Sequence, residues 1–211
     1  MCVARSRREG GVVTSAFSDL AGVAGGLWDP APEGRRAAAQ AAACFPDSVP
    51  LLVARLRVET DPKVFGALES SLVSIGSDAV VMGVVPLLRA CEPAVRIVGT
   101  DILRVLGERS EPVARALLTD IDPALRMIGV TIVRGLPTPE APDWLLDVLR
   151  RDPNPTVCVS ALECLAEIAR PDMAPAVRAA RDRFSDSEEF AAGIDQVLRV
   201  IDPGVWTARA P

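Results

Sequence analysis

EPAVRIVGTDILRVLG, residues 92–107, contains the pattern that decides the fold. The residues of its apolar stripe recur at intervals of three and four: Val95, Val98, Gly99, Ile102, Leu103 and Leu106. This spacing places them along one face of a helix. Glu92 directly precedes Pro93, and proline is well tolerated at the first position of a helix because its missing N–H has no intrahelical partner there. The stretch therefore predicts a helix that begins near residue 93 and buries one face.

The same opening returns about every 30 residues. Acidic residues precede proline at Asp61-Pro62, Glu92-Pro93, Asp122-Pro123 and Asp152-Pro153, spaced 31, 30 and 30 residues apart, and Asp29-Pro30 lies 32 residues before the first pair. In the fifth unit the apolar stripe fits if Asn154-Pro155 opens the helix, since Asp or Asn at the N-cap accepts a hydrogen bond from a free first-turn amide. A second apolar segment follows each stripe, so one period holds two helices of about 12 residues with short turns. The chain is therefore predicted to be a tandem array of stacked helical hairpins.

These hairpins resemble the HEAT repeat, specifically the short bacterial kind found in phycobilisome lyase-like proteins. The segments that carry the resemblance are DPAPEGRRAAAQAAA (29–43), EPAVRIVGTDILRVLG (92–107), DPNPTVCVSALECLAEIA (152–169), VPLLVARL (49–56) and APDWLLDVL (141–149). The resemblance covers residues 29–201. It implies an all-α fold, a right-handed α-solenoid (an armadillo/HEAT-like superhelix) of about five hairpins with N- and C-terminal capping helices. The arginine that the family has after the first stripe residue is present at Arg35, Arg96 and Arg126 and is replaced by Phe65 and Cys158.

The period also predicts how the chain is divided. We expect an N-terminal arm and capping helix at 1–28, hairpins at 29–60, 61–91, 92–121, 122–151 and 152–185, a closing cap at 186–201, and a C-terminal tail at 202–211 that contains Trp206. The solenoid then spans 29–201. Pro86 lies inside the second helix of the second hairpin, where it removes a backbone hydrogen bond, so we expect that helix to be distorted.

The composition argues against catalysis. The chain has no histidine, the commonest general base and metal ligand, and the HEAT-repeat iron hydroxylases depend on His-Glu pairs. The phosphate-cradling, dinucleotide-binding and nucleophile-elbow motifs are absent from the sequence. We therefore expect no catalytic residue, no metal and no cofactor.

The charge and the cysteines bear on partners and compartment. A net charge of −5 disfavours general affinity for nucleic acid or anionic membranes, which needs local Lys and Arg. Five scattered cysteines without CxxC spacing favour reduced thiols and a cytoplasmic protein, and no apolar run is long enough to cross a membrane. Cys164 falls on the buried stripe and is expected to be a core residue. Cys158 is expected to be exposed, either as a plain replacement of arginine or as a reactive or chromophore-attaching thiol.

The second helices carry most of their charge as arginine. The candidate residues of a partner-binding groove are Arg55, Arg57, Arg89, Arg115, Arg150, Arg151, Arg178 and Arg181, and Arg183 belongs to the same row. Second helices line the concave face of HEAT-like solenoids, so the resemblance implies a mildly basic groove there. The alternative is an ordinary solvated face with arginine stems lying along it.

The leading interpretation is a non-catalytic protein–protein interaction scaffold or adaptor, whose partner is another protein with an acidic or phosphorylated surface. The resemblance to phycobilisome lyase-like proteins suggests an alternative, an accessory or lyase-like factor for a cofactor-bearing protein. A nucleic-acid-binding HEAT-like protein is a third interpretation, which the net charge and the widely separated Trp28, Trp144 and Trp206 disfavour.

Overall fold

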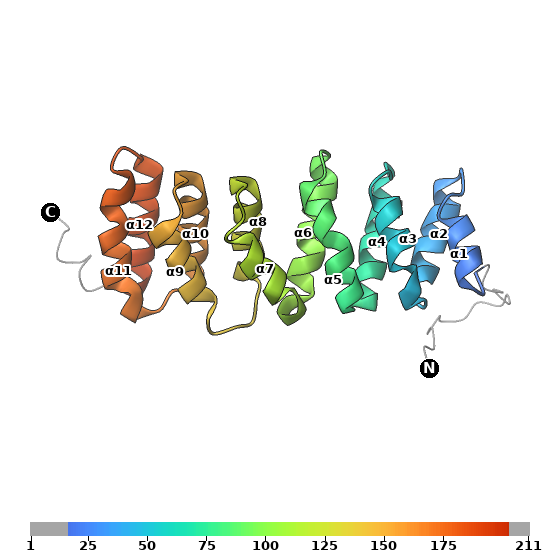
Figure 1. Ribbon diagram of the computed structural model, residues 1–211, viewed down its shortest axis with the longest axis horizontal. Coiled ribbons are helices and arrows are strands. Elements are labelled where there is room, and N and C mark those ends of the chain that lie inside the picture. The colour runs from blue at the N-terminus through green and yellow to red at the C-terminus, as the bar shows by residue number, and fades with distance from the viewer. Residues whose placement is uncertain (1–16, 203–211) are drawn as a thin grey trace. The chain divides into compact units, whose positions relative to one another are not determined.

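The computed structural model describes residues 17–202, and this part of the chain consists of twelve α-helices, short 3-10 helices and no strands (Figure 1). The predicted all-α fold class is confirmed. The chain divides between Ile102 and Leu103 into two compact units, which are described separately below. Two expectations, for the N-terminal arm up to residue 16 and for the tail with Trp206, lie outside the described residues.

Unit 1 consists of hairpins whose first helices pack on one another. Its elements are α1 (Leu20–Gly26), α2 (Pro32–Ala42), η1 (Pro46–Ser48), α3 (Val49–Leu56), α4 (Pro62–Ile75), α5 (Asp78–Val84), η2 (Val85–Arg89) and the part of α6 (Pro93–Val105) up to Ile102. α2 packs on α1 and on α4, while the second helix α3 packs on α4 and on α5. First and second helices therefore form two layers with the apolar core between them.

Unit 2 repeats this arrangement. After the end of α6 its elements are η3 (Gly107–Ser110), α7 (Glu111–Leu117), α8 (Pro123–Arg134), α9 (Ala141–Arg151), α10 (Pro155–Ile168), η4 (Pro171–Met173), α11 (Ala174–Ala179), η5 (Ala180–Phe184) and α12 (Glu188–Ile201). The first helix α10 packs on both α8 and α12, and the second helices α7, α9 and α11 cover the other side of that layer. Stacked helical hairpins, the HEAT-like architecture, are thus present in both units.

The helices α4, α8 and α10 have the predicted side-chain caps. The opening at Asp29-Pro30 differs, because α2 begins at Pro32 and its N-cap, Ala31, makes no side-chain cap bond. The Asp61 carboxylate accepts hydrogen bonds from the amides of Lys63 and Val64 at 2.8 and 3.2 Å, and Asp122 caps α8 in the same way. At α10 the cap is Asn154 rather than Asp152, as the register of the apolar stripe requires. Asp152 is thereby left for another role, described below.

The distortion expected at Pro86 is confirmed, and a glycine explains a close helix contact. α5 ends at Val84, and the chain continues as a 3-10 helix through Pro86, because proline cannot supply the next helical N–H. Gly129 allows α8 to approach α7 closely: a Cβ atom there would lie 2.9 Å from the Leu118 backbone nitrogen. The small residue in the middle of the stripe is therefore a packing requirement.

Candidate functional site

A groove between the second helices α7 and α9 of unit 2 is the best-formed candidate site. It has a volume of about 430 Å³, and its lining includes Arg115, Leu118, Trp144, Asp147, Val148 and Arg151. Leu118, Trp144, Val148 and Pro153 are the apolar residues of the lining, and six charged residues complete it together with Thr119. Apolar surface beside charged groups is a mixture found at binding sites.

Trp144 supplies a flat surface in this groove. The guanidinium carbon of Arg115 lies 5.1 Å from the centre of its ring, which is the distance of a cation–π contact. The Arg115 side chain is nevertheless 60% exposed, and Glu111, the carboxylate that pairs with it, is 3.9 Å away. An ion pair this long and this exposed contributes little to the stability of the fold. The N–H groups of Arg115 can therefore bind a ligand with little loss of stability.

Arg151 stands on the same groove, and its side chain is 79% exposed. Asp147 lies 3.9 Å from Arg151 and 3.7 Å from Arg150, so one half-exposed carboxylate serves two guanidinium groups. The edge formed by α9 therefore has more hydrogen-bond donors than acceptors, since each guanidinium carries five N–H groups.

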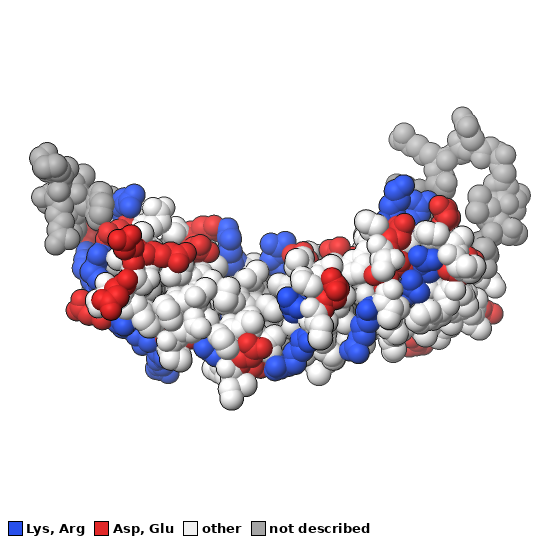
Figure 2. Space-filling view, turned by 90° about the horizontal axis from the view of Figure 1, so that it is seen from above, with Lys and Arg blue, Asp and Glu red and all other residues white. Residues whose placement is uncertain are grey.

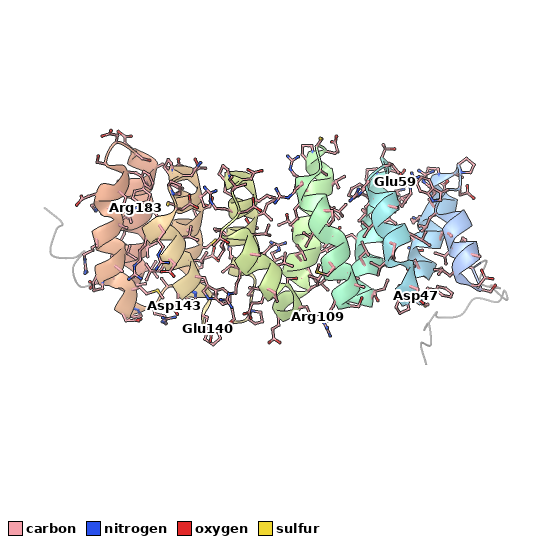
Figure 3. All side chains as sticks on the ribbon, viewed as in Figure 1. Asp47, Glu59, Arg109, Glu140, Asp143 and Arg183 are labelled. Carbon is pink, nitrogen blue, oxygen red and sulfur yellow. The ribbon has the colours of Figure 1, made fainter. Side chains whose placement is uncertain are left out.

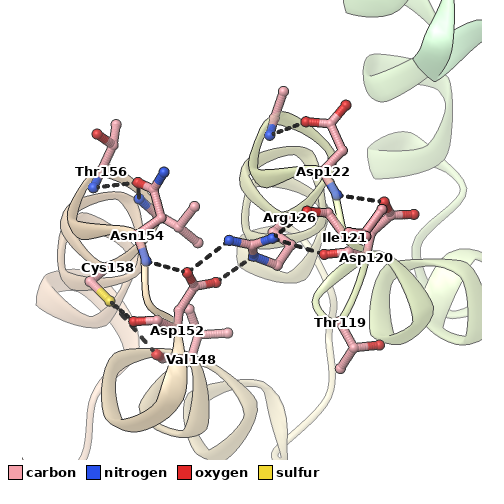
Figure 4. Close-up of polar contacts among 12 residues, drawn as sticks. Thr119, Asp120, Ile121, Asp122, Arg126, Val148, Asp152, Asn154, Thr156 and Cys158 are labelled. Atoms are coloured by element: carbon pink, nitrogen blue, oxygen red, sulfur yellow. Dashed lines mark hydrogen bonds and ion pairs between the residues drawn. The ribbon is translucent and has the colours of Figure 1, made fainter.

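A closed ion pair, Arg126 with Asp152, forms another part of the groove lining (Figure 4). Nε of Arg126 lies 2.6 Å from Oδ2 of Asp152, and Nη2 lies 3.0 Å from Oδ1. Nη1 donates to the carbonyl oxygens of Asp120 and Ile121, at 2.9 and 3.1 Å. The hydrogen bond with Asp152 raises the pKa of Arg126 further above its usual value. Because every nitrogen of this guanidinium is engaged, Arg126 fixes the groove and is not available to a partner.

Unit 1 contains an equivalent pair, Arg35 with Glu59. Glu59, three residues after the end of α3, is labelled in Figure 3. The guanidinium of Arg35 meets the carboxylate of Glu59 at 2.9 and 3.0 Å and donates to the carbonyls of Asp29 and Pro30. Burial alone would raise the pKa of Glu59, but the hydrogen bonds from Arg35 and Arg55 hold it well below its usual range. Arg96 makes the same two carbonyl bonds at the start of α6. Arg35, Arg96 and Arg126 thus fasten helix openings.

The predicted groove residues of unit 1 do not form one site. Arg55 bonds to Glu59 at 2.9 Å and stacks over Trp28 at 5.0 Å, and its side chain is only 12% exposed, so it belongs to the internal structure. Arg57 is exposed beside a second, largely apolar groove between α3 and α5. Arg89 is exposed in η2.

In unit 2 the structure brings together part of the predicted set. Arg115 and Arg151 line the groove, and Arg150 shares Asp147 with Arg151. Arg178 and Arg181 instead pair with Asp202 and Asp195 and fasten the last hairpin. Figure 2 shows basic and acidic side chains interspersed over the face in view.

Sequence reasoning missed Trp144 and Asp152 as groove residues. The place of Trp144 on a second helix, next to the arginine row, is the sequence signal that could have identified it. Asp152 belongs to an acidic-proline pair, and this pattern predicts a helix opening rather than a groove residue. The shift of the cap to Asn154 was the signal that its carboxylate was free for another partner.

The expectation of an exposed Cys158 is wrong. Its side chain is buried, with Sγ 3.5 Å from the carbonyl oxygen of Asp152 and 3.8 Å from that of Val148. Burial raises the pKa of this thiol, against a smaller lowering effect of the nearby Arg183 guanidinium. Cys164 is buried as predicted, and burial raises its pKa to about 11.

The described residues were also compared with the requirements of a metal site and of a membrane-spanning helix. Between residues 17 and 202 no three His, Cys, Asp or Glu side chains are grouped as metal ligands would be. None of the helices in this range combines the length and the apolar character needed to span a bilayer.

No family model matches this sequence, and neither does any curated protein. Solved structures do match. A designed armadillo repeat protein is 14% identical, with 87% of this chain and 100% of that chain covered and a TM-score of 0.40. Human deoxyhypusine hydroxylase, in complex with glycerol, is 16% identical over 87% of this chain and 84% of that chain, with a TM-score of 0.43.

The complex of CpcE and CpcF of phycocyanin lyase from Nostoc sp. PCC7120 is 13% identical, with 95% of this chain and 99% of that chain covered and a TM-score of 0.38. The chain is similar to helical-repeat proteins. This likeness concerns the arrangement of helices alone, and the activities named for these proteins are properties of those proteins.

Proposed function

We propose that the chain is a non-catalytic protein–protein interaction scaffold that docks a segment of another protein in the α7–α9 groove. The observation that carries this proposal is the open Arg115–Trp144 pair, an aromatic plane with an exposed guanidinium above it in a groove of about 430 Å³. Aromatic residues and arginine are the side chains enriched at the centres of protein interfaces.

The occupant we propose is an acidic segment. The exposed guanidinium groups of Arg115 and Arg151 line the groove, and Arg150 shares Asp147 with Arg151. Of the carboxylates in the lining, Asp152 is engaged by Arg126, which leaves Asp120 and Asp147, and Glu111 lies beside Arg115. The distances of 3.7 to 3.9 Å leave the arginine N–H groups open to a ligand with better geometry. Carboxylates accept two parallel N–H bonds from one guanidinium, so an acidic peptide satisfies donors that the groove leaves to water.

A cytoplasmic location is part of the same proposal. Cys91, Cys158 and Cys164 are free thiols, which suits a reducing compartment. The alternative of a lyase-like factor finds less support, because Cys158, the thiol considered for chromophore attachment, is buried beneath Arg183.

The test is a selection of random 12-residue peptides displayed on phage against the full chain. We expect acidic sequences to be enriched, and a synthetic peptide of that sequence to lose at least tenfold in affinity towards Arg115→Gln/Arg151→Gln and towards Trp144→Ala. Arg178→Gln/Arg181→Gln is the matched control, since it removes the same charge from residues paired with α12.

Three outcomes would contradict the proposal. Peptides without acidic residues would refute the acidic occupant, and equal affinity for the wild type and the groove variants would refute the site. Tighter binding of a phosphoserine peptide or of a single-stranded 12-mer DNA than of the acidic peptide would replace the occupant by a phosphorylated protein or by nucleic acid.

A further inference from the structure

Three helices share an arginine at their fourth residue. Arg35 of α2, Arg96 of α6 and Arg126 of α8 each donate from Nη1 to the carbonyl oxygens six and five residues earlier, at 2.8 to 3.1 Å. These carbonyls belong to the turn that opens the hairpin. The bonds therefore fasten each turn to the helix that follows it.

The fourth residue of α10 is Cys158, which cannot make these bonds. Its thiol is a weak donor with one hydrogen, and it lies 3.5 Å from the Asp152 carbonyl, the group six residues earlier. A partly buried carbonyl without a good donor destabilises a fold by about the strength of a lost hydrogen bond. The opening of α10 therefore needs a donor from elsewhere.

Arg183 supplies that donor from the next hairpin. It extends from η5, and it is labelled in Figure 3 on the last hairpin. Nη2 lies 2.6 Å from the Asp152 carbonyl oxygen, Nη1 donates to the Leu149 carbonyl, and Nη1 is 3.6 Å from Sγ of Cys158. The guanidinium thus bonds to the same carbonyl that an arginine at position 158 would reach.

The surroundings hold Arg183 in this place. Its guanidinium stacks over the Phe184 ring at 5.0 Å, and Phe184 in turn packs edge-on against the buried Phe190 of α12. The sequence separations also indicate that Arg183 replaces the arginine that is missing at position 158. Arg35 and Arg126 pair with carboxylates 24 and 26 residues later, and Cys158 meets Arg183 25 residues later. At the opening of α10 the guanidinium group therefore comes from the later hairpin and not from the fourth residue of the helix.

We propose that Arg183 is a positioning residue for the docking groove and acts through Asp152. The backbone carbonyl of Asp152 is held by Arg183, its carboxylate by Arg126, and that carboxylate also accepts the Asn154 amide at 2.8 Å. Since Asp152 and Val148 line the groove, the last hairpin determines the shape of a site that it does not itself line. This inference rests on the proposed function only where it concerns binding.

The experiment moves the arginine within the chain. It compares the wild type with Arg183→Gln, with Arg183→Gln/Cys158→Arg, and with Arg181→Gln as a neighbouring control whose partner is Asp195. The first readout is amide hydrogen exchange of residues 149–154. The second, for variants that keep Cys158, is the rate of maleimide labelling of that thiol, resolved by mass spectrometry with the exposed Cys91 as internal reference. The third is the affinity of the acidic peptide.

We expect Arg183→Gln to raise exchange and Cys158 labelling by about tenfold and to weaken the peptide severalfold. Arg183→Gln/Cys158→Arg should restore both amide protection and affinity, because the guanidinium returns to the position used in α2, α6 and α8. Arg181→Gln should behave as the wild type. Should Arg183→Gln unfold the last hairpin, Arg183→Lys, which keeps a single cationic donor nitrogen in place of three, should give intermediate exchange.

The two proposals fail in distinguishable ways. Wild-type exchange in Arg183→Gln would refute the fastening role of Arg183. Raised exchange with unchanged peptide affinity would refute its effect on the groove and leave the groove standing. If the wild type bound no peptide, the docking function and the effect on it would both be wrong, and the exchange data would still decide whether Arg183 holds the α10 opening.

Discussion

The guanidinium of Arg126 meets the carboxylate of Asp152 at two points, 2.6 Å from Nε to Oδ2 and 3.0 Å from Nη2 to Oδ1. The pair joins the start of α8 to the turn before α10, and the Asp152 side chain is only 4% exposed. Breaking such a pair is costly in stability, because it leaves a largely buried charge without a partner.

Asp152→Ala should therefore lower the free energy of unfolding by about 3 kcal/mol. It leaves the Arg126 guanidinium without its carboxylate and the Asn154 amide without its acceptor. Urea denaturation followed by circular dichroism measures the change. Asp147→Ala, which removes a half-exposed carboxylate of the same groove, should change stability by less than about 0.5 kcal/mol. Equal losses of stability in the two variants would mean that the Arg126–Asp152 pair contributes no more than an exposed ion pair.

Glu59→Gln should change how stability depends on pH. The pKa of Glu59 is depressed in the folded protein, so its ionised form stabilises the fold above its ordinary value of 4.5, and that contribution is lost progressively as the pH falls below about 5. The difference in melting temperature between the wild type and Glu59→Gln should be largest at pH 7 and should shrink towards pH 4. The exposed Glu33→Gln serves as the control. Parallel curves for the wild type and Glu59→Gln would contradict the role of this carboxylate.

Ile132→Asp should unfold unit 2. Ile132 and Leu103 are fully buried, and an unpaired carboxylate in that position costs several kcal/mol. Loss of the helical circular dichroism signal on purification, for either Ile132→Asp or Leu103→Asp, is the expected result. Ile121→Asp is the matched control, because Ile121 is 94% exposed, and it should melt as the wild type does. A wild-type melting curve for Ile132→Asp would be incompatible with the packing described above.

Two glycine substitutions should act in opposite directions. Gly66→Ala adds a methyl group on α4 where no atom lies within 4 Å, and alanine is the better helix former, so stability should rise by about 0.5 to 1 kcal/mol. Gly129→Ala places its Cβ 2.9 Å from a backbone nitrogen of α7 and should lower stability by about 1 to 3 kcal/mol. Thermal denaturation of the pair tests the close approach of α8 and α7, and a stabilising Gly129→Ala would refute it.

The hairpin repeat could be predicted from sequence because its causes are local. The caps at Asp61 and Asp122, the distortion at Pro86 and the close approach at Gly129 each follow from one residue and its immediate neighbours. The burial of Cys158 could not be predicted in this way. The guanidinium that covers it comes from Arg183, 25 residues later, and no local pattern indicates that Arg183 points inward while Arg150 and Arg151 point outward. For the same reason the sequence predicts Arg115 and Arg151 as groove residues but not Trp144 and Asp152.

Asp152 is bonded through both its backbone carbonyl and its carboxylate. Residues bonded in this way hold unit 2 together, and a different set of residues faces the solvent in the groove. Arg126, Asp152 and Arg183 are bound to one another or to the backbone. Arg115 instead stacks on Trp144, and Arg115 and Arg151 make only long ion pairs that leave their guanidinium groups exposed. Selection or design could therefore exchange the second set freely and give the same framework a new ligand preference without refolding it.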